Sequence, residues 1–456
     1  MEKLRYIAAT GMVGAGFYES SLQAGMAQHP AFIGCDAGSS DPGPFQLGSG
    51  GLIFSSDACA RDLALSYRAA RQAGVPLLVG SCGGAGANVG VDHFADLLSQ
   101  VVREEGSTAR VARIYAEPDR ALLAERYRKG RIKPLVGAPP IYEGQFASSA
   151  RIVAMMGIEP FQVAIDAGAD VVLAGRSSDT SIFAALPDRL GYDRGLIWHA
   201  AKIVECGSAA ISNRIGQDCI MCTLADDAFV IEPLRDGLRC TPTSVAAHTL
   251  YETSDPFHIV EPSGILDTTG AVYEALDERR VRVTGSTFAS ADTYTVKLEG
   301  AELVGYQSIT MGGVRDPVIL RQLDSWLDSM RDSILAKIEA STGLGADKYH
   351  LDITAYGRNG VLGSLEPDPR STGHEAFLLF AVTAASQSEA STLIRLTSHV
   401  AMHHTVSEWT GSITGIAHPF APATIDRGEV YRFNFNHVLE LDDPMEVFTI
   451  EMEEMA

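Results

Sequence analysis

The stretch VPLLVGSCGGAGAN, residues 75–88, decides the fold. Its apolar run predicts a buried strand, and its glycine-rich loop leads into a helix expected at residues 92–105. Three more loops of this kind follow apolar runs: GMVGAGF (residues 11–17), CDAGSSDPGP (residues 35–44) and AGRSSDTS (residues 174–181). Loops at the carboxyl ends of parallel strands lie side by side over one crevice, where ligands bind. We therefore expect the four loops to form one composite site.

Strands and helices alternate through the first half of the chain. Strands are expected at residues 6–10, 31–35, 75–79, 109–116 and 171–174, and helices at residues 17–28, 57–72, 92–105 and 118–129. Buried β-branched strands that alternate with helices predict an α/β fold with a Rossmann-like, doubly wound parallel sheet.

The pattern also predicts two domains. Residues 1–342 are expected to form the α/β domain, within which residues 195–315 make a more mixed α+β subdomain. It ends with a long amphipathic helix at residues 316–341. The order of expected strands and helix in residues 343–456 predicts a small ferredoxin-like α+β C-terminal domain. Its expected strands are residues 351–356, 376–384, 431–441 and 445–451, with a helix at residues 389–402.

Composition narrows the class of protein. The 456 residues are 46% hydrophobic and carry a net charge of −21, which disfavours nucleic acid and anionic membranes as partners. There is no signal-peptide pattern and no apolar run of about 20 residues. Seven irregularly spaced cysteines fit a reducing compartment. We expect a cytoplasmic homo-oligomer that binds a small anionic molecule.

The first loop half-matches a dinucleotide-binding fingerprint. Gly14 and Gly16 begin a G-x-G-x-x-G motif, but Glu19 stands where the third glycine belongs. Asp36 follows the second strand, where such folds keep the acid that binds the ribose. This favours a small-ligand or phosphate loop over a dinucleotide site, and it keeps an NAD(P)-dependent oxidoreductase as an alternative.

The second loop combines carboxylates with hydroxyls. Asp36 and Asp41 could share a proton, act as acid and base, or bind a hard divalent cation. Ser39 and Ser40 are candidate substrate contacts. Local turn formation is the other role these residue types commonly have.

The third loop supplies candidate lining residues. Cys82, Gly83 and Gly84 are expected to contact the substrate, and Asn88 to cap the helix or donate to the ligand. A lone cysteine is more commonly buried and inert than reactive.

The fourth loop supplies a cation beside an acid. Arg176 suits a carboxylate or phosphate clamp, with Ser177 and Ser178 as further substrate contacts. Asp179 is a candidate catalytic acid or base. The alternative is an Arg176–Asp179 pair that fixes the loop.

Three more candidates lie on the helix expected at residues 197–206. Glu205 and Cys206 are candidate catalytic residues, and His199 is a candidate substrate contact. His199 and Glu205 are six residues apart and do not share a helix face, so this pair alone does not predict a metal site.

As a set, the motifs GMVGAGF, LLVGSCGGAGAN, DAGADVVLAGRSSDTS and HAAKIVECGSAA resemble the acyclic terpene utilisation (AtuA) family over most of residues 1–340. The later stretches YETSDPFHIVEPSGILD and RVRVTGSTF fit the same pattern. The resemblance implies a catabolic enzyme of branched acyl-CoA compounds and carboxylic acids. The tail lacks the R-S-G-D-K-G run expected in that family.

Together these observations predict a lyase or hydratase, or an isomerase, that acts on a small carboxylic acid or its CoA thioester. It would abstract a proton and stabilise the enolate through the loop donors. The alternatives are an NAD(P)-dependent oxidoreductase and a non-catalytic subunit of a two-component enzyme.

Overall fold

The computed structural model describes residues 3–369, 373–406 and 415–456. The chain forms two compact units, Met1–Glu302 with Phe433–Ala456, and Leu303–Arg432. The division expected after residue 342 instead falls inside the second unit, directly after α12 (Leu323–Thr342).

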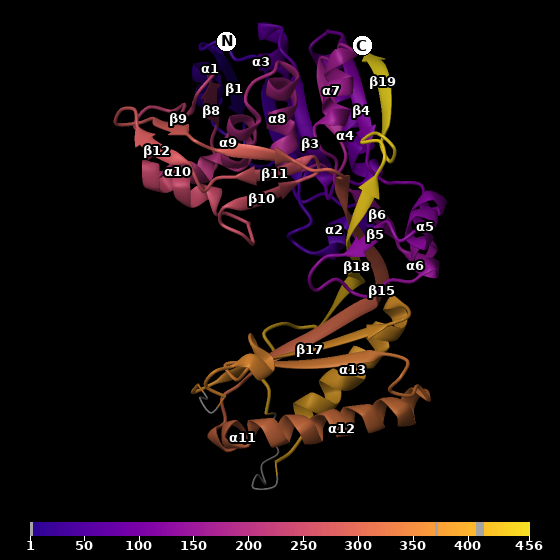
Figure 1. The fold of residues 1–456 in the computed structure, drawn as a ribbon. Helices are drawn as coiled ribbons and strands as arrows, with labels where there is room; N and C mark the ends of the chain where they lie inside the picture. Colours follow the sequence, from indigo (N-terminus) through magenta and orange to yellow (C-terminus); the bar gives the residue numbers. More distant parts are fainter. Residues whose placement is uncertain (1–2, 370–372, 407–414) are drawn as a thin grey trace. The chain divides into compact units, whose positions relative to one another are not determined.

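A ten-stranded mixed sheet forms the centre of the first unit (Figure 1). Its parallel strands, in spatial order, are β1 (Leu4–Ala8), β2 (Ile33–Gly38), β3 (Leu77–Gly84), β7 (Val171–Ala174) and β4 (Ala109–Tyr115). Antiparallel strands extend the β1 side: β8 (Ile220–Leu224), β9 (Phe229–Pro233), β13 (Val281–Thr284) and β12 (Val272–Ala275). The expected α/β class, with a parallel centre, is confirmed.

Helices cover both faces of this sheet. The face with Ile7 and Val79 packs against α1 (Glu19–Met26), α3 (Ser56–Ala73) and α4 (Asn88–Glu104). The face with Tyr6 and Leu78 packs against α7 (Glu159–Asp166), α8 (Asp179–Arg189) and α9 (Arg194–Val204). After β3 the chain forms α4 on one face of the sheet, and after the neighbouring β7 it forms α8 on the opposite face. This arrangement creates a topological switch point between their carboxyl ends, where open α/β sheets bind ligands.

The remaining elements of the first unit surround this centre. They are α2 (Pro44–Ser49), α5 (Arg120–Arg128), β5 (Ile132–Pro134), α6 (Glu143–Ser148), β6 (Arg151–Ala154), α10 (Pro242–Thr249), and the three-stranded sheet of β10 (His258–Glu261), β11 (Gly264–Asp267) and β14 (Thr287–Ser290). β15 (Tyr294–Val314) pairs with β6, and this register places Glu299 opposite Val153.

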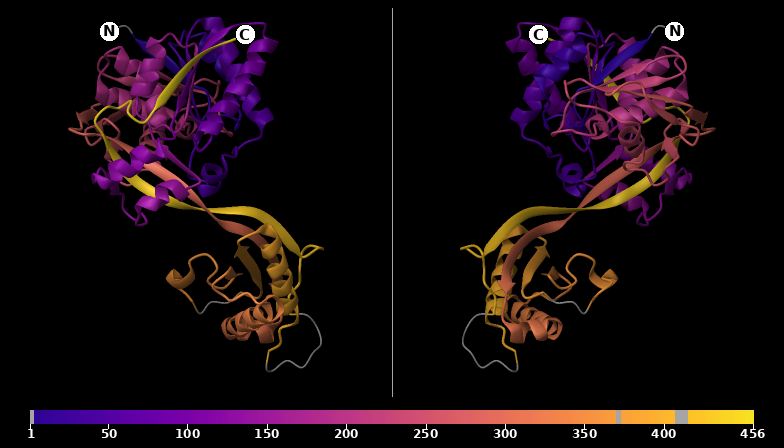
Figure 2. Two further views of the ribbon diagram at one scale, coloured as in Figure 1. Left: turned by 90° about the vertical axis from the view of Figure 1, so that its right-hand side faces the viewer. Right: turned by 90° about the vertical axis from the view of Figure 1, so that its left-hand side faces the viewer.

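The second unit is a sheet with helices packed against it. Its strands are β16 (His350–Tyr356), β17 (Ala376–Ala384) and parts of β15 and β18 (Thr424–Leu441), and its helices are α11 (Pro317–Arg321), α12 and α13 (Gln387–His403). β15 and β18 are neighbours that can be followed side by side in Figure 2. Side chains of α12, α13 and β17 form one hydrophobic core.

The prediction of a ferredoxin-like tail is not confirmed. Its last strand, β19 (Thr449–Met455), leaves the tail and pairs antiparallel with β4 at the edge of the large sheet. None of the helices in the described residues has the length and hydropathy of a membrane span.

Candidate functional site

The four loops do meet at the carboxyl edge of the parallel strands, and glycines permit the contact. A Cβ atom on Gly38 would lie 1.9 Å from the Gly84 carbonyl oxygen, so the second and third loops touch through their backbones. Gly86 has φ +68°, and its Cβ would lie 2.3 Å from the Arg176 nitrogen of the fourth loop. The first loop joins them because the Val13 N–H donates to the Asp36 carbonyl at 2.8 Å.

The first loop binds an anion, but that anion belongs to the protein. The N–H groups of Gly14 and Gly16 both donate to Asp62 Oδ2 at 2.9 Å. Asp62 comes from α3, its side chain is 1% exposed, and Arg61 pairs with its other oxygen. The donors expected to bind a substrate or a cofactor phosphate are therefore already occupied.

We expect Asp62→Ala to lower the free energy of unfolding by about 1–3 kcal/mol, because it leaves two loop N–H groups without an acceptor. Urea unfolding measures this loss. Asp57→Ala, on the exposed side of the same helix, is the matched control and should change stability far less. Equal effects of the two substitutions would contradict the role assigned to Asp62.

The polar groups of Asn88, in the third loop, also hydrogen-bond to other groups of the chain. Asn88 begins α4, and its Oδ1 accepts from the N–H groups of Ala116 and Glu117 at 3.1 and 3.2 Å. Glu117 in turn accepts from the Asn88 N–H at 2.9 Å. Asn88 therefore ties the start of α4 to the end of β4.

Cys82 and the adjacent glycines also pack internally. Cys82 is fully buried, and burial raises the pKa of its thiol, which stays protonated at neutral pH. A Cβ on Gly83 would lie 2.3 Å from Gly90 Cα, and one on Gly84 would lie 2.8 Å from the Gly51 carbonyl. These three residues shape the crevice through backbone packing.

Arg176 is held by a residue that the sequence patterns did not reveal. Its Nε donates to Glu299 Oε2 at 2.7 Å, and Glu299 also accepts from Lys297 and Ser40. Burial opposes ionisation of Glu299, but Arg176 and Lys297 outweigh it and lower its pKa to about 2. Arg176 is therefore an ion-paired wall of the site. Its Nη1 lies 3.9 Å from Asp179 Oδ1, so the expected pair within the loop is present but long.

Ser81 is a second residue that the sequence patterns missed. It is fully buried and adopts φ 49°, a strained conformation for a residue other than glycine. Its Oγ lies 3.5 Å from Arg176 Nη1 and accepts from the Ser177 N–H at 3.3 Å. The strain places a hydroxyl between the third and fourth loops.

Buried carboxyl groups with raised pKa values dominate the chemistry of the site. We call Asp36, Asp179, Glu205 and Glu261 the acid cluster. Burial raises the pKa of Asp179 to about 6, that of Glu261 to about 7 and that of Glu205 to about 8. Burial and the nearby Asp179 also raise the pKa of Asp36. Near neutral pH the cluster therefore holds both protonated and ionised carboxyls, as acid–base catalysis requires.

Neighbouring groups fix the members of the cluster. Lys202, on the largely buried helix α9, donates to Glu205 Oε1 at 2.5 Å. The hydroxyls of Ser178 and Thr180 each donate to Glu261 at 2.7 Å. Ser178 therefore positions an acid of the cluster.

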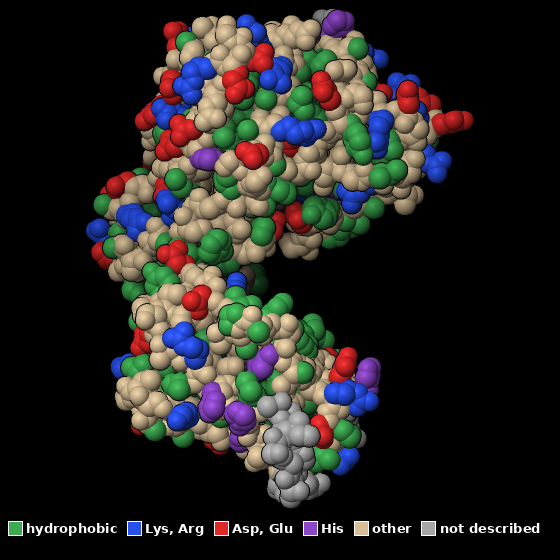
Figure 3. Space-filling model, turned by 180° about the vertical axis from the view of Figure 1, so that it is seen from behind, with side chains coloured by type: hydrophobic (Ala, Val, Ile, Leu, Met, Phe, Trp, Pro, Cys, Tyr) green, Lys and Arg blue, Asp and Glu red, His purple; other side chains and the backbone are tan. Residues whose placement is uncertain are grey.

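Exposure singles out Asp179. Its side chain is 28% exposed, whereas that of Glu205 is 5% exposed. Asp41 is exposed and close enough to raise the pKa of Asp179 further, and its N–H donates to Ser39 Oγ. Asp179 is therefore more open to solvent than Glu205. The acid cluster contrasts with the surface seen in Figure 3, where positive and negative side chains are interspersed.

Two candidates of α9 and its end have other roles than expected. Both ring nitrogens of His199 have partners, Ser286 Oγ at 2.5 Å and Thr249 Oγ1 at 3.1 Å. Burial lowers its pKa to about 3, so His199 is a neutral core residue and the expected substrate contact is wrong. Cys206 lies beside Gly11 of the first loop, but burial raises the pKa of its thiol and leaves no thiolate for catalysis.

No metal centre is assigned. Within the residues the structure describes, no three His, Cys, Asp or Glu side chains are arranged to hold a metal ion.

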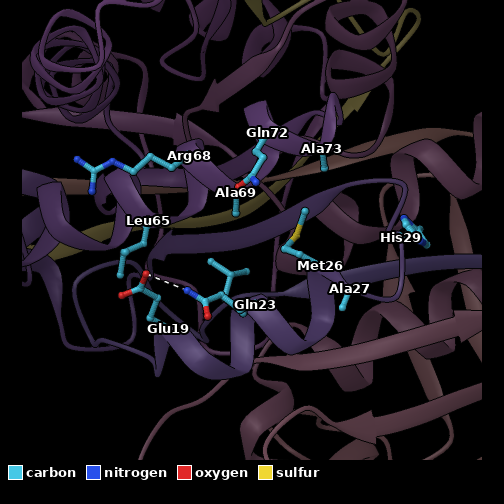
Figure 4. A pocket seen from close by; sticks show the side chains of 11 residues that line it. Glu19, Gln23, Met26, Ala27, His29, Leu65, Arg68, Ala69, Gln72 and Ala73 are labelled. Carbon is cyan, nitrogen blue, oxygen red and sulfur yellow. Dashed lines mark hydrogen bonds between the residues drawn. The ribbon is translucent and has the colours of Figure 1, made fainter.

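A separate groove of about 580 Å³ opens between α1 and α3 (Figure 4). Glu19, which replaces the third glycine of the fingerprint, lines it and accepts from Gln23 at 3.2 Å. None of its eleven lining residues belongs to the four loops.

The raised pKa values predict how stability depends on pH. Asp179, Glu205 and Glu261 titrate near pH 4 in an unfolded chain, so the folded state binds more protons above that pH. The free energy of unfolding should therefore decrease as pH rises from about 4.5 to about 8. Urea unfolding across this range tests it. Glu261→Gln should make the free energy of unfolding depend less steeply on pH, and the exposed control Glu278→Gln should not. Equal pH dependence in wild-type protein and both variants would contradict the raised pKa of Glu261.

Comparison with known proteins yields one match. Residues 76–188 and 220–425 match a family model described as acyclic terpene utilisation family protein AtuA, and these segments make up most of the chain. The resemblance drawn from the sequence motifs is therefore confirmed. No match was found among curated proteins, and none among solved structures.

Proposed function

Since the chain belongs to the acyclic terpene utilisation family, we propose that it is a catabolic lyase or hydratase that acts on a small carboxylic acid or its CoA thioester. The family description supports a role in degrading branched carbon compounds. The reaction class rests on the site itself.

The observation that carries the proposal is the acid cluster at the switch point. Asp179 is a partly exposed carboxyl with a pKa of about 6, beside buried Glu261 and Glu205 with pKa values of about 7 and 8. A base that titrates just below neutral pH, next to protonated acids, is suited to moving a proton to and from carbon.

The proposed step is an elimination of water. Asp179 removes the proton α to the carbonyl, and the electron pair of that C–H bond forms the carbon–carbon double bond. The C–O bond at the β carbon breaks, and its hydroxyl leaves as water with a proton from a protonated acid of the cluster. Hydration is the reverse, and neither direction needs an oxidant.

The hydrogen bonds of the first glycine loop argue against an NAD(P)-dependent oxidoreductase. Asp62 fills the N–H cradle where the dinucleotide phosphate would bind. Occupied donors favour proton transfer over a nicotinamide-dependent reaction.

A direct assay tests the proposal. The purified chain is incubated with β-hydroxybutyryl-CoA, and the ultraviolet absorbance of the conjugated enoyl thioester is followed. We expect it to rise with wild-type protein and with Asp96→Asn, an exposed control on α4, but not with Asp179→Asn. No absorbance change with wild-type protein on this or branched β-hydroxyacyl thioesters would refute it.

A further inference from the structure

The three α-helices that the structure describes in the second unit all pack on one face of its sheet. That face carries Leu378, Phe380 and Val382 of β17, which share a hydrophobic core with side chains of α11, α12 and α13. Successive residues of a strand point to opposite faces, so Phe377 and Leu379 point away from this core. Neither of them belongs to it. We call the side of the sheet that carries Phe377 and Leu379 the open face.

The open face carries an apolar stripe that crosses neighbouring strands. The pairing of β16 with β17 places Tyr356 opposite Phe377, and the pairing of β17 with β15 places Leu379 opposite Met311 and Ala381 opposite Ile309. Tyr356 is 43% exposed and Phe377 is 39% exposed. Contiguous apolar surface of this kind is typical of an interaction site. The stripe consists of Tyr356, Phe377, Leu379, Met311, Ile309 and, on β18, Ile425.

Charges of opposite sign lie at the two borders of the stripe. At the β16 border, Asp352 is exposed and lies opposite Ala381, on the open face. At the β18 border, Arg427 is exposed and its Nη1 donates to Gln307 Oε1 at 2.6 Å. Gln307 is on the open face because it lies two residues before Ile309 on β15, so Arg427 is on that face too. The open face therefore has an acidic edge and a basic edge.

We propose that the open face is an interface between two copies of this chain, packed sheet on sheet about a twofold axis parallel to the strands. Such an axis keeps the strand directions of the two sheets aligned, as in other face-to-face sheet packings. It lays the stripe on its own copy and places β16 of one copy over β18 of the other. Asp352 then meets Arg427 of the partner subunit, and this ion pair forms twice. A twofold axis across the strands would instead place β16 over β16 and leave each Arg427 without a carboxylate, so the charges select the first axis.

The area of the open face sets the expected strength of the dimer. Four strands spaced about 4.8 Å apart, with about seven residues each at about 3.4 Å per residue, give a flat area of roughly 450 Å². Two copies would bury roughly twice that area, which is at the low end of specific protein interfaces. The dimer should therefore form reversibly, with the chain mostly dimeric at about 100 μM and mostly monomeric at about 1 μM.

Sedimentation velocity of the full chain across this concentration range tests the proposal. The buffer holds about 0.15 M salt, which screens the repulsion between two chains of net charge −21. Phe377→Glu places a charge within the stripe and should keep the chain monomeric at every concentration. Val136→Glu adds the same charge at a fully exposed residue of the first unit and should dimerise as wild-type protein does. A wild-type chain that is monomeric at 100 μM, or a dimer that persists in Phe377→Glu, would overturn the proposal.

A charge exchange tests the orientation of the two copies. Asp352→Arg alone and Arg427→Glu alone each bring like charges together across the interface, so each should weaken dimerisation at least about tenfold. The double variant restores opposite charges and should recover most of the wild-type affinity. Both residues are exposed, so these variants should fold normally, as thermal unfolding would show. Losses that add in the double variant, or single variants with wild-type affinity, would contradict the twofold axis parallel to the strands.

Discussion

Asp179→Asn is expected to lower kcat by about 10²- to 10⁴-fold, the usual loss when a general base is removed. Asparagine has nearly the same shape but cannot accept the proton at the relevant pH. Asp179 is the partly exposed member of the acid cluster, so we propose it as the carboxyl that meets the substrate. The measurement is kcat by the enoyl absorbance assay, with thermal unfolding to show that the variant is folded.

The pH dependence provides the second readout for this residue. In wild-type protein, kcat should rise as pH increases through about 6, because Asp179 must be ionised to act as the base. A folded Asp179→Asn variant with full activity, or with the wild-type rise near pH 6, would contradict the assignment. Asp96→Asn should reproduce the wild-type profile.

Glu299→Leu is expected to destabilise the protein by about 3–5 kcal/mol, because it leaves Arg176 charged and buried without its carboxylate partner. Arg176 is 7% exposed in its side chain, and its Nε–Oε2 bond of 2.7 Å is the short contact of the pair. Lys297 and Ser40 lose the same acceptor. Urea unfolding measures the loss, and Glu278→Leu is the exposed control.

A double substitution distinguishes the pair from simple packing. Arg176→Met in the Glu299→Leu background removes the uncompensated charge and should recover a large part of the lost stability. Additive losses from the two substitutions would contradict a coupled buried pair.

Sequence patterns predicted the architecture of the site because that architecture is local. Each glycine loop follows its strand directly, so β3 with residues 80–88 and β7 with residues 174–181 could be placed at one edge before any contact was known. The α/β class and helices such as α3 and α13 followed from the same periodicity.

The partners inside the site could not be read in this way. Glu299 reaches Arg176 from a strand that lies 123 residues later, and Glu261 reaches Ser178 from 83 residues later. Such contacts depend on tertiary pairing, which a single sequence does not show. Lys202 did leave a signal, since it is a charged residue within the apolar run WHAAKIV on a helix buried on every side.

The glycine loops were also misleading in one way. A loop rich in N–H donors predicts an anion, and the anion is present, but Asp62 and Glu117 supply it from within the chain. β19 was misplaced for a related reason, because its pairing with β4 joins segments more than three hundred residues apart.

Exchange of hydrogen between solvent and substrate tests the central claim most directly. Butyryl-CoA is incubated with the protein in D₂O, and deuterium at the α carbon is measured by mass spectrometry. The account predicts that wild-type protein and Asp96→Asn incorporate deuterium at the α carbon, and that Asp179→Asn does so at least about a hundredfold more slowly. Absence of incorporation with wild-type protein, or an equal rate in Asp179→Asn, would contradict a proton-transfer site at the switch point.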